Sequence, residues 1–214
     1  MVREKYLQQL DSVRDDLANL GDDVCSMFSL SEKCIVGWDK PGQKKVAAMA
    51  VRANKQFIAL EEKCLQMLAR QQPVASDLRF ITSSLHASRK LERCASYAWE
   101  IAQTMLLLRT RITVGLPEFS SMEKTAEGAL RIAVRGFVEK DMKLTVEVIE
   151  LEKENDEQQH ILLEKLKDEA QRGRSHAEVA FRAYMMSKYL ERAADNAIRI
   201  TNATGYMVTG EKKY

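Results

Sequence analysis

The sequence has few of the residues that build tight turns, and it lacks the segments that mark membrane or secreted proteins. Its 214 residues include only three prolines and nine glycines, too few for an all-β protein in which tight turns recur. No run of about 18 apolar residues occurs, so no membrane-spanning helix is expected. The polar amino-terminal segment does not have the pattern of a signal peptide, which predicts a cytoplasmic protein.

An excess of one charge is also missing. The 33 Lys and Arg residues nearly balance the 31 Asp and Glu residues, which leaves a formal net charge of +2. Nucleic-acid-binding proteins usually carry a basic excess, so we expect no nucleic-acid partner. Hydrophobic residues make up 45% of the chain, which supplies a buried core and argues against a disordered chain.

Closely paired cysteines are absent as well. The four cysteines are separated by 9, 30 and 30 residues, whereas zinc ribbons and fingers need close pairs of ligands. Cys64 and Cys94 fall at apolar positions of helical patterns, which predicts buried thiols. No Cys–His or Ser–His–Asp constellation can be assembled, so a catalytic nucleophile is not expected.

Helical periodicity dominates what is present. All three prolines fall where helical patterns break, and no stretch alternates with a period of two. The fold class is therefore all-α. The predicted helices span roughly residues 3–36, 41–70, 75–110, 118–138, 141–172 and 174–208.

Several local signals predict where helices begin and end. Ser120 and Ser175 each precede a glutamate by three residues, which fits a capping box at a helix start. Gly173 is expected to stop a helix, and residues 136–141 can form a tight turn. In the last helix, eight residues follow alternating spacings of three and four, which predicts a buried heptad stripe. They are Ala183, Met186, Leu190, Ala193, Ala197, Ile200, Thr204 and Met207.

Two segments of the chain repeat each other. Residues 91–101 and 190–200 share Leu, Glu, Arg, two Ala and Ile at an offset of 99 residues. A common coiled-coil pattern explains the apolar matches but not the shared Leu-Glu-Arg. We therefore predict two tandem three-helix bundles that arose by duplication, residues 1–110 and 114–214.

Two pairs of carboxylates stand out in the second half. Glu152 and Asp156 are four residues apart, as are Glu191 and Asp195, so each pair shares one helix face. Like charges at this spacing repel by roughly 0.2–0.5 kcal/mol. Carboxylates from adjacent helices can converge on a hard cation. A solvated acidic face with Lys and Arg neighbours is the alternative.

Longer sequence strings resemble the PhoU family. They are Gln-Pro-Val-Ala-Ser-Asp-Leu-Arg at 72–79, Leu-Glu-Arg at 91–93, and Tyr-Leu-Glu-Arg-Ala-Ala-Asp-Asn-Ala at 189–197. In the first string, Pro73 is expected to end one helix, and Ser76 or Asp77 to cap the next. The resemblance covers nearly the whole chain, and it implies two tandem three-helix bundles.

The resemblance also implies a function. PhoU-like proteins are cytoplasmic regulators without enzymatic activity that restrain high-affinity phosphate uptake and phosphate-starvation signalling. The expected partners are the ATPase of a phosphate ABC transporter and a sensor histidine kinase, with only peripheral contact with the membrane complex. A homodimer is expected from the family alone.

Family members also carry multinuclear metal clusters. The resemblance implies a full set of ligands in the second bundle and an incomplete set in the first. Glu152, Asp156, Glu191 and Asp195 match the motif in the second bundle. The motif often continues with Asn where this chain has Arg199, whose guanidinium is able to pair with Asp195 and displace a cation. The expected metal is iron, zinc, manganese or magnesium.

The first bundle departs further from the metal motif. Glu92 and Glu100 are its weak candidate ligands, and Ser96 replaces an aspartate. The preceding helix offers Ala50 and Asn54 where carboxylates are expected. The metal site of the first bundle is therefore predicted to lack most of its ligands.

Two other functions stay open at this point. The chain is also compatible with a PhoU-like regulator of a different transporter or channel. A metal-dependent helical-bundle enzyme is a weaker alternative, because di-iron bundles use two Glu-x-x-His motifs. Glu157 and His160 form the single copy present.

Overall fold

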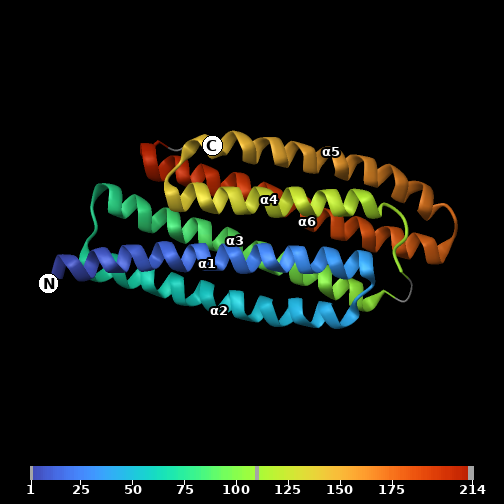
Figure 1. The fold of residues 1–214 in the computed structure, drawn as a ribbon, viewed down its shortest axis with the longest axis horizontal. Coiled ribbons are helices and arrows are strands. Elements are labelled where there is room, and N and C mark those ends of the chain that lie inside the picture. The colour runs from blue at the N-terminus through green and yellow to red at the C-terminus, as the bar shows by residue number, and fades with distance from the viewer. Residues whose placement is uncertain (1, 109–110, 212–214) are drawn as a thin grey trace.

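A computed structural model describes residues 2–108 and 111–211. The structure is built from long antiparallel helices that lie side by side (Figure 1), and no strand occurs in the described ranges. The elements are α1 (Val2–Gly37), α2 (Lys40–Gln71), α3 (Ala75–Leu107), α4 (Leu116–Glu139), the short 3₁₀ helix η1 (Met142–Leu144), α5 (Thr145–Ala170) and α6 (Arg174–Thr209). The all-α prediction is confirmed. Among these helices, none is long and apolar enough to cross a bilayer.

The helices form two three-helix bundles that share one core, α1–α3 and α4–α6. α1 packs against α4 and α3 against α6, so these four helices surround the centre while α2 and α5 flank it. The prediction of tandem bundles is confirmed. The expected bundle boundary falls in the connection after α3, and its residue 110 lies outside the described residues.

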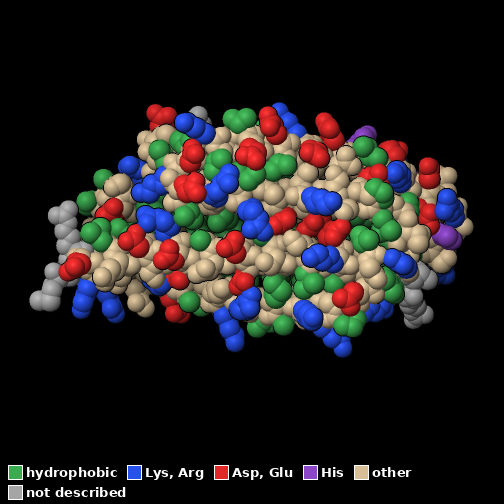
Figure 2. Space-filling view, in the orientation of Figure 1, with side chains coloured by type: hydrophobic (Ala, Val, Ile, Leu, Met, Phe, Trp, Pro, Cys, Tyr) green, Lys and Arg blue, Asp and Glu red, His purple; other side chains and the backbone are tan. Residues whose placement is uncertain are grey.

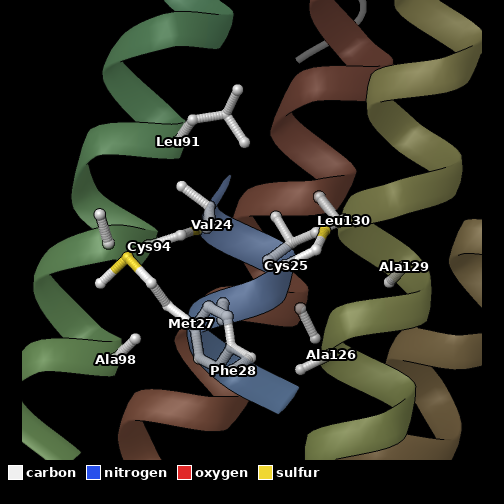
Figure 3. Packing of buried hydrophobic residues seen from close by; sticks show 14 of the residues in the cluster. Val24, Cys25, Met27, Phe28, Leu91, Cys94, Ala98, Ala126, Ala129 and Leu130 are labelled. Carbon is white, nitrogen blue, oxygen red and sulfur yellow. The ribbon is translucent and has the colours of Figure 1, made fainter. Parts of the chain in front are cut away.

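Buried side chains run through the junction between the bundles without a break (Figure 3). Met27 and Phe28 of α1 are fully buried, Met27 beside Cys94 of α3 and Phe28 beside Ala126 of α4. On the α3–α6 side, the rings of Tyr97 and Tyr189 stack with centroids 5.8 Å apart. The heptad stripe predicted for α6 is buried at all eight positions.

The predicted capping boxes are wrong. α4 begins at Leu116 and α6 at Arg174, and neither start has a side-chain cap. Instead, the Ser120 hydroxyl donates to Glu32 on α1 at 2.5 Å, so a contact between bundles takes the place of the local cap. Gly115 precedes α4 at φ +70°, where an added Cβ would lie 2.1 Å from Leu162.

At the other helix ends, some of the predicted caps and turns are confirmed and others are corrected. α3 begins after Val74 with no side-chain cap, so the expected cap from Ser76 or Asp77 is absent there. Gly173 was expected to end a helix, but α5 already ends at Ala170, and Gly173 instead directly precedes the start of α6. The tight turn at 136–141 is confirmed, because the Asp141 amide donates to the Gly136 carbonyl at 2.9 Å.

Candidate functional site

The four predicted carboxylates of the second bundle come together along the groove between α5 and α6. Glu152 of α5 and Asp195 of α6 line one hollow, and the charges of Glu191 and Asp195 act on both Glu152 and Asp156. Asp156 is exposed and the other three are partly exposed. The group therefore lies on the surface of the bundle and not inside its core.

Their electrostatics are those of a crowded acidic group. Burial raises the pKa of Glu152 above its usual range, and the negative charges of Asp156 and Asp195 raise it further. Burial is likewise the main cause that raises the pKa of Asp156, followed by the charges of Glu191 and Asp195. Glu152 and Asp156 thus resist ionisation first because they are partly buried and then because of neighbouring acids, and a bound cation would relieve that repulsion.

Lysines compensate part of this charge. Lys188 Nζ lies 2.5 Å from Glu191 Oε2, and its charge lowers the pKa of Asp156. Lys153 has the same effect on the pKa of Glu152. The effect of Lys188 on Asp156 is smaller than those of burial, Glu191 and Asp195, and the effect of Lys153 on Glu152 is smaller than those of burial, Asp156 and Asp195, so both pKa shifts stay upward.

A hollow of about 380 Å³ opens beside the acidic group. Glu152 and Asp195 line it from opposite helices, and Arg199 lines it one turn further along α6. Within the described part of the chain, no ion pair joins Arg199 to Asp195. Ile149 and Asn202 also line the hollow, and the motif did not point to either of them.

The chemistry of this donor set fits a hard cation. Over residues 2–108 and 111–211, no three Asp, Glu, Cys or His side chains already stand close enough to hold a metal ion. The four carboxylates nevertheless offer only oxygen donors, which is what Mg²⁺ and Mn²⁺ prefer. Because they are at least partly exposed, they can turn toward a shared ion without repacking the core.

The corresponding groove of the first bundle does not contain this donor set. Ala50 and Asn54 of α2 face Glu92 and Ser96 of α3 across a hollow of about 370 Å³. Its other lining residues are Ala47, Val51, Ala95 and Trp99. The Ser96 hydroxyl donates to Glu92 Oε1 at 3.3 Å. A single carboxylate among apolar and neutral neighbours does not fit a metal cluster.

Glu100, the second weak candidate ligand in the first bundle, acts electrostatically on Tyr189 of α6 instead. Burial raises the pKa of Tyr189 on α6, and the negative charge of Glu100 raises it further. The charge of Glu100 therefore acts on the Tyr97–Tyr189 stack between the bundles. The structure does not group Glu100 with Glu92 around the hollow.

Sequence comparison finds the same domain in both bundles. The family model described as "PhoU domain" matches residues 17–105 and again residues 119–204. The chain is 22% identical over 209 residues to the phosphate-specific transport system accessory protein PhoU homolog 1 of Methanothermobacter thermautotrophicus, covering 97% of this chain and 95% of that protein. It is 25% identical over 210 residues to the PhoU homolog of Caulobacter vibrioides, covering 94% and 91%.

Structural comparison finds the same fold in two crystal structures. PhoU from Pseudomonas aeruginosa superposes with a TM-score of 0.91 at 24% identity, covering 96% of this chain and all of that one. The phosphate transport system regulatory protein PhoU from Streptococcus pneumoniae gives a TM-score of 0.88 at 21% identity, covering 98% and 99%. With its domain present in both bundles and its fold shared over the full length, the chain belongs to the PhoU family.

Proposed function

We propose that this protein regulates high-affinity phosphate uptake by binding the ATPase of a phosphate ABC transporter. The observation that carries the proposal is the PhoU domain in both bundles, together with relatives named phosphate-specific transport system accessory proteins. In this role the protein acts in the cytoplasm, through contact and without turnover. A sensor histidine kinase as second partner and a homodimer stay predictions.

We further propose that α5 and α6 hold a metal cluster through Glu152, Asp156, Glu191 and Asp195. Support comes from the raised pKa of Glu152 and of Asp156, both caused partly by neighbouring carboxylates. The cluster would neutralise these acids and fix the relative positions of the two helices. An open groove suits contact with a partner better than catalysis, which usually takes place in an enclosed pocket.

Phosphate uptake in cells tests the regulatory role. Cells that lack this protein should take up labelled phosphate faster than wild-type cells when phosphate is plentiful, and the restored gene should reverse the change. The tagged protein should also capture the transporter ATPase from membranes. Unchanged uptake together with no capture of the ATPase would overturn the proposal.

The same assay separates the contact from the metal. The double variant Glu191→Ala/Asp195→Ala removes two carboxylates that lie outside the shared core. Arg192→Ala, at an exposed position of the same helix, is its matched control. If the cluster shapes the docking surface, only the double variant should lose restraint of uptake. Equal uptake with both variants would leave the regulatory role intact and contradict a role for the cluster.

A further inference from the structure

The hollow between α2 and α3, which we call the α2–α3 hollow, has the composition of a small-molecule site. Its volume is about 370 Å³, and it is lined by Ala47, Ala50, Val51, Asn54, Glu92, Ala95, Ser96 and Trp99. Five of these eight side chains are apolar and three are polar. Pockets for small ligands usually have volumes of about 300–1,000 Å³ and a mostly apolar lining, with a few polar groups that orient the ligand. The α2–α3 hollow therefore suits a small organic ligand better than a bare ion.

Small side chains on α2 leave room for such a ligand. The alignment that places Ala50 opposite Glu152 of α5 also places Ala47 opposite an isoleucine. Those two larger α5 residues line the hollow of the second bundle. Val51, which lines the α2–α3 hollow, is 59% exposed. Figure 2 shows hydrophobic side chains open to solvent between Lys and Arg along the lower edge of the view, where α2 runs in Figure 1. The α2 wall of the hollow is therefore accessible from solvent.

The carboxylate in this hollow has no cationic partner. In the second bundle, Lys188 forms an ion pair with Glu191, which lies three residues further along α6. The residue of α3 that corresponds to this lysine is Arg89, whose guanidinium pairs with Glu61 of α2 instead. Among the residues that the structure describes, no Lys or Arg forms an ion pair with Glu92. The charge of Glu92 is thus free to attract a positively charged ligand.

The other polar groups and the indole suit an ammonium group. The Ser96 hydroxyl donates to Glu92 Oε1 at 3.3 Å, so its oxygen can still accept a hydrogen bond. The side-chain carbonyl of Asn54 is a third acceptor, and an alkylammonium has three N–H donors. Trp99 follows Glu92 by about two turns on the same face of α3, and an indole ring attracts a cation. The alanines leave an apolar surface for an alkyl chain.

We propose that the α2–α3 hollow binds the ammonium group of an alkylamine, with Glu92 as its counter-charge and Trp99 as its aromatic wall. The alkyl chain packs against the alanines of α2. A free amine and a lysine side chain of another protein share this chemistry, and the experiments distinguish them. The proposal is independent of the role in phosphate transport.

Ligand-observed NMR with n-butylammonium tests the site, and n-butanol is the neutral probe of the same shape. The wild-type protein should bind n-butylammonium saturably and about threefold or more tightly than n-butanol, because only the cation pairs with Glu92. Glu92→Gln should abolish this preference. Glu100→Gln, on the same helix but outside the hollow, is the matched control and should keep it. No saturable binding of n-butylammonium, equal binding of the alcohol, or the same loss in both variants would overturn the proposal.

Tryptophan fluorescence tests whether the ligand lies in this hollow. The chain has two tryptophans, so Trp38→Phe leaves Trp99 as the only one. In that background, n-butylammonium should change the emission of Trp99 over the concentration range in which it binds by NMR. Trp99→Leu should weaken binding about two- to fivefold through loss of the cation–π contact. Unchanged emission at saturation, or unchanged affinity of Trp99→Leu, would contradict binding beside the indole.

A lysine derivative identifies the source of the ammonium group. Nα-acetyl-lysine N-methylamide carries the same ammonium and alkyl chain on a peptide backbone. Tighter binding of this derivative than of n-butylammonium would support a lysine side chain of another protein as the ligand. Weaker binding would support a free amine, because the backbone is then excluded from the hollow. Binding of neither probe would overturn the ammonium site.

Discussion

Glu152 of α5 and Asp195 of α6 line the same hollow, and the charge of Asp195 raises the pKa of Glu152. In the first bundle, the corresponding positions are Ala50 and Ser96, which also face one hollow. The duplicated fold therefore places the same two positions together twice. Only the second copy carries carboxylates at these two positions, so the two bundles have diverged in chemistry while keeping their geometry.

Arg199 should weaken cation binding at this hollow. Arg199 lines the hollow together with Glu152 and Asp195, and a positive charge this close costs a bound cation on the order of 1 kcal/mol near a protein surface. We expect Arg199→Asn to lower the dissociation constant for Mn²⁺ by about three- to tenfold, measured by calorimetric titration. Arg192→Asn, which lies outside the hollow, is the control. Equal affinities of the two variants would contradict the assignment of Arg199 to the site.

The two bundles should unfold together. Phe28 is fully buried in the core that both bundles share, so Phe28→Ala should lower the free energy of unfolding by about 3–5 kcal/mol. Urea denaturation should show a single transition in both proteins, because the cavity lies in the common core. Leu7→Ala, at a 52% exposed position of α1, should cost less than about 0.5 kcal/mol. Two separate transitions in the wild-type protein would contradict a shared core.

Stability should fall as the pH rises from about 5 to about 7. Burial, and then the charges of Glu127 and Glu32, raise the pKa of Glu123 from 4.5 to about 7. The folded protein therefore keeps a proton on Glu123 that the unfolded chain has already lost. This shift contributes about 3 kcal/mol below pH 4.5, and the contribution is lost as the pH passes through 7.

Substitution of Glu123 should remove this pH dependence. Glu123→Gln keeps the shape of the protonated acid, so it should be more stable than the wild-type protein at pH 8 and should flatten the profile. Glu139→Gln, at the exposed end of α4, should leave the profile unchanged. Urea unfolding at a series of pH values provides the measurement. A wild-type profile with no decline between pH 5 and 7 would rule out the buried acid as its source.

The four cysteines should be unreactive in the folded protein. Each is buried and free, and burial raises the pKa of Cys25 and of Cys64 to about 12. Because the thiolate is the reactive form, a thiol reagent at pH 8 should label the native protein hardly at all. It should label all four thiols after denaturation in urea. Rapid labelling of the native protein would show that at least one thiol is open to solvent.

The sequence predicted the features that depend on periodicity. The heptad stripe of α6 is buried from Ala183 to Met207, because seven-residue spacing turns one helix side toward the core. The burial of Cys64 and Cys94 also followed from helical periodicity, and the turn at 136–141 was predicted by a local signal between two helices. Such local patterns are sufficient when each helix buries one side.

Features that depend on contacts between bundles could not be predicted in this way. Ser120 fits a local cap by spacing, yet its hydroxyl bonds to Glu32, which is 88 residues away. The burial of Glu123 likewise depends on the meeting of α1 and α4, and no local pattern indicates it.

Metal content is the measurement that tests the candidate site most directly. The protein is purified without chelator and its bound metals are quantified by elemental mass spectrometry. The wild-type protein should carry stoichiometric metal, Glu191→Ala/Asp195→Ala should lose it, and Glu92→Ala/Glu100→Ala in the first bundle should keep it. Wild-type protein without metal, or metal retained after loss of Glu191 and Asp195, would contradict the second-bundle cluster.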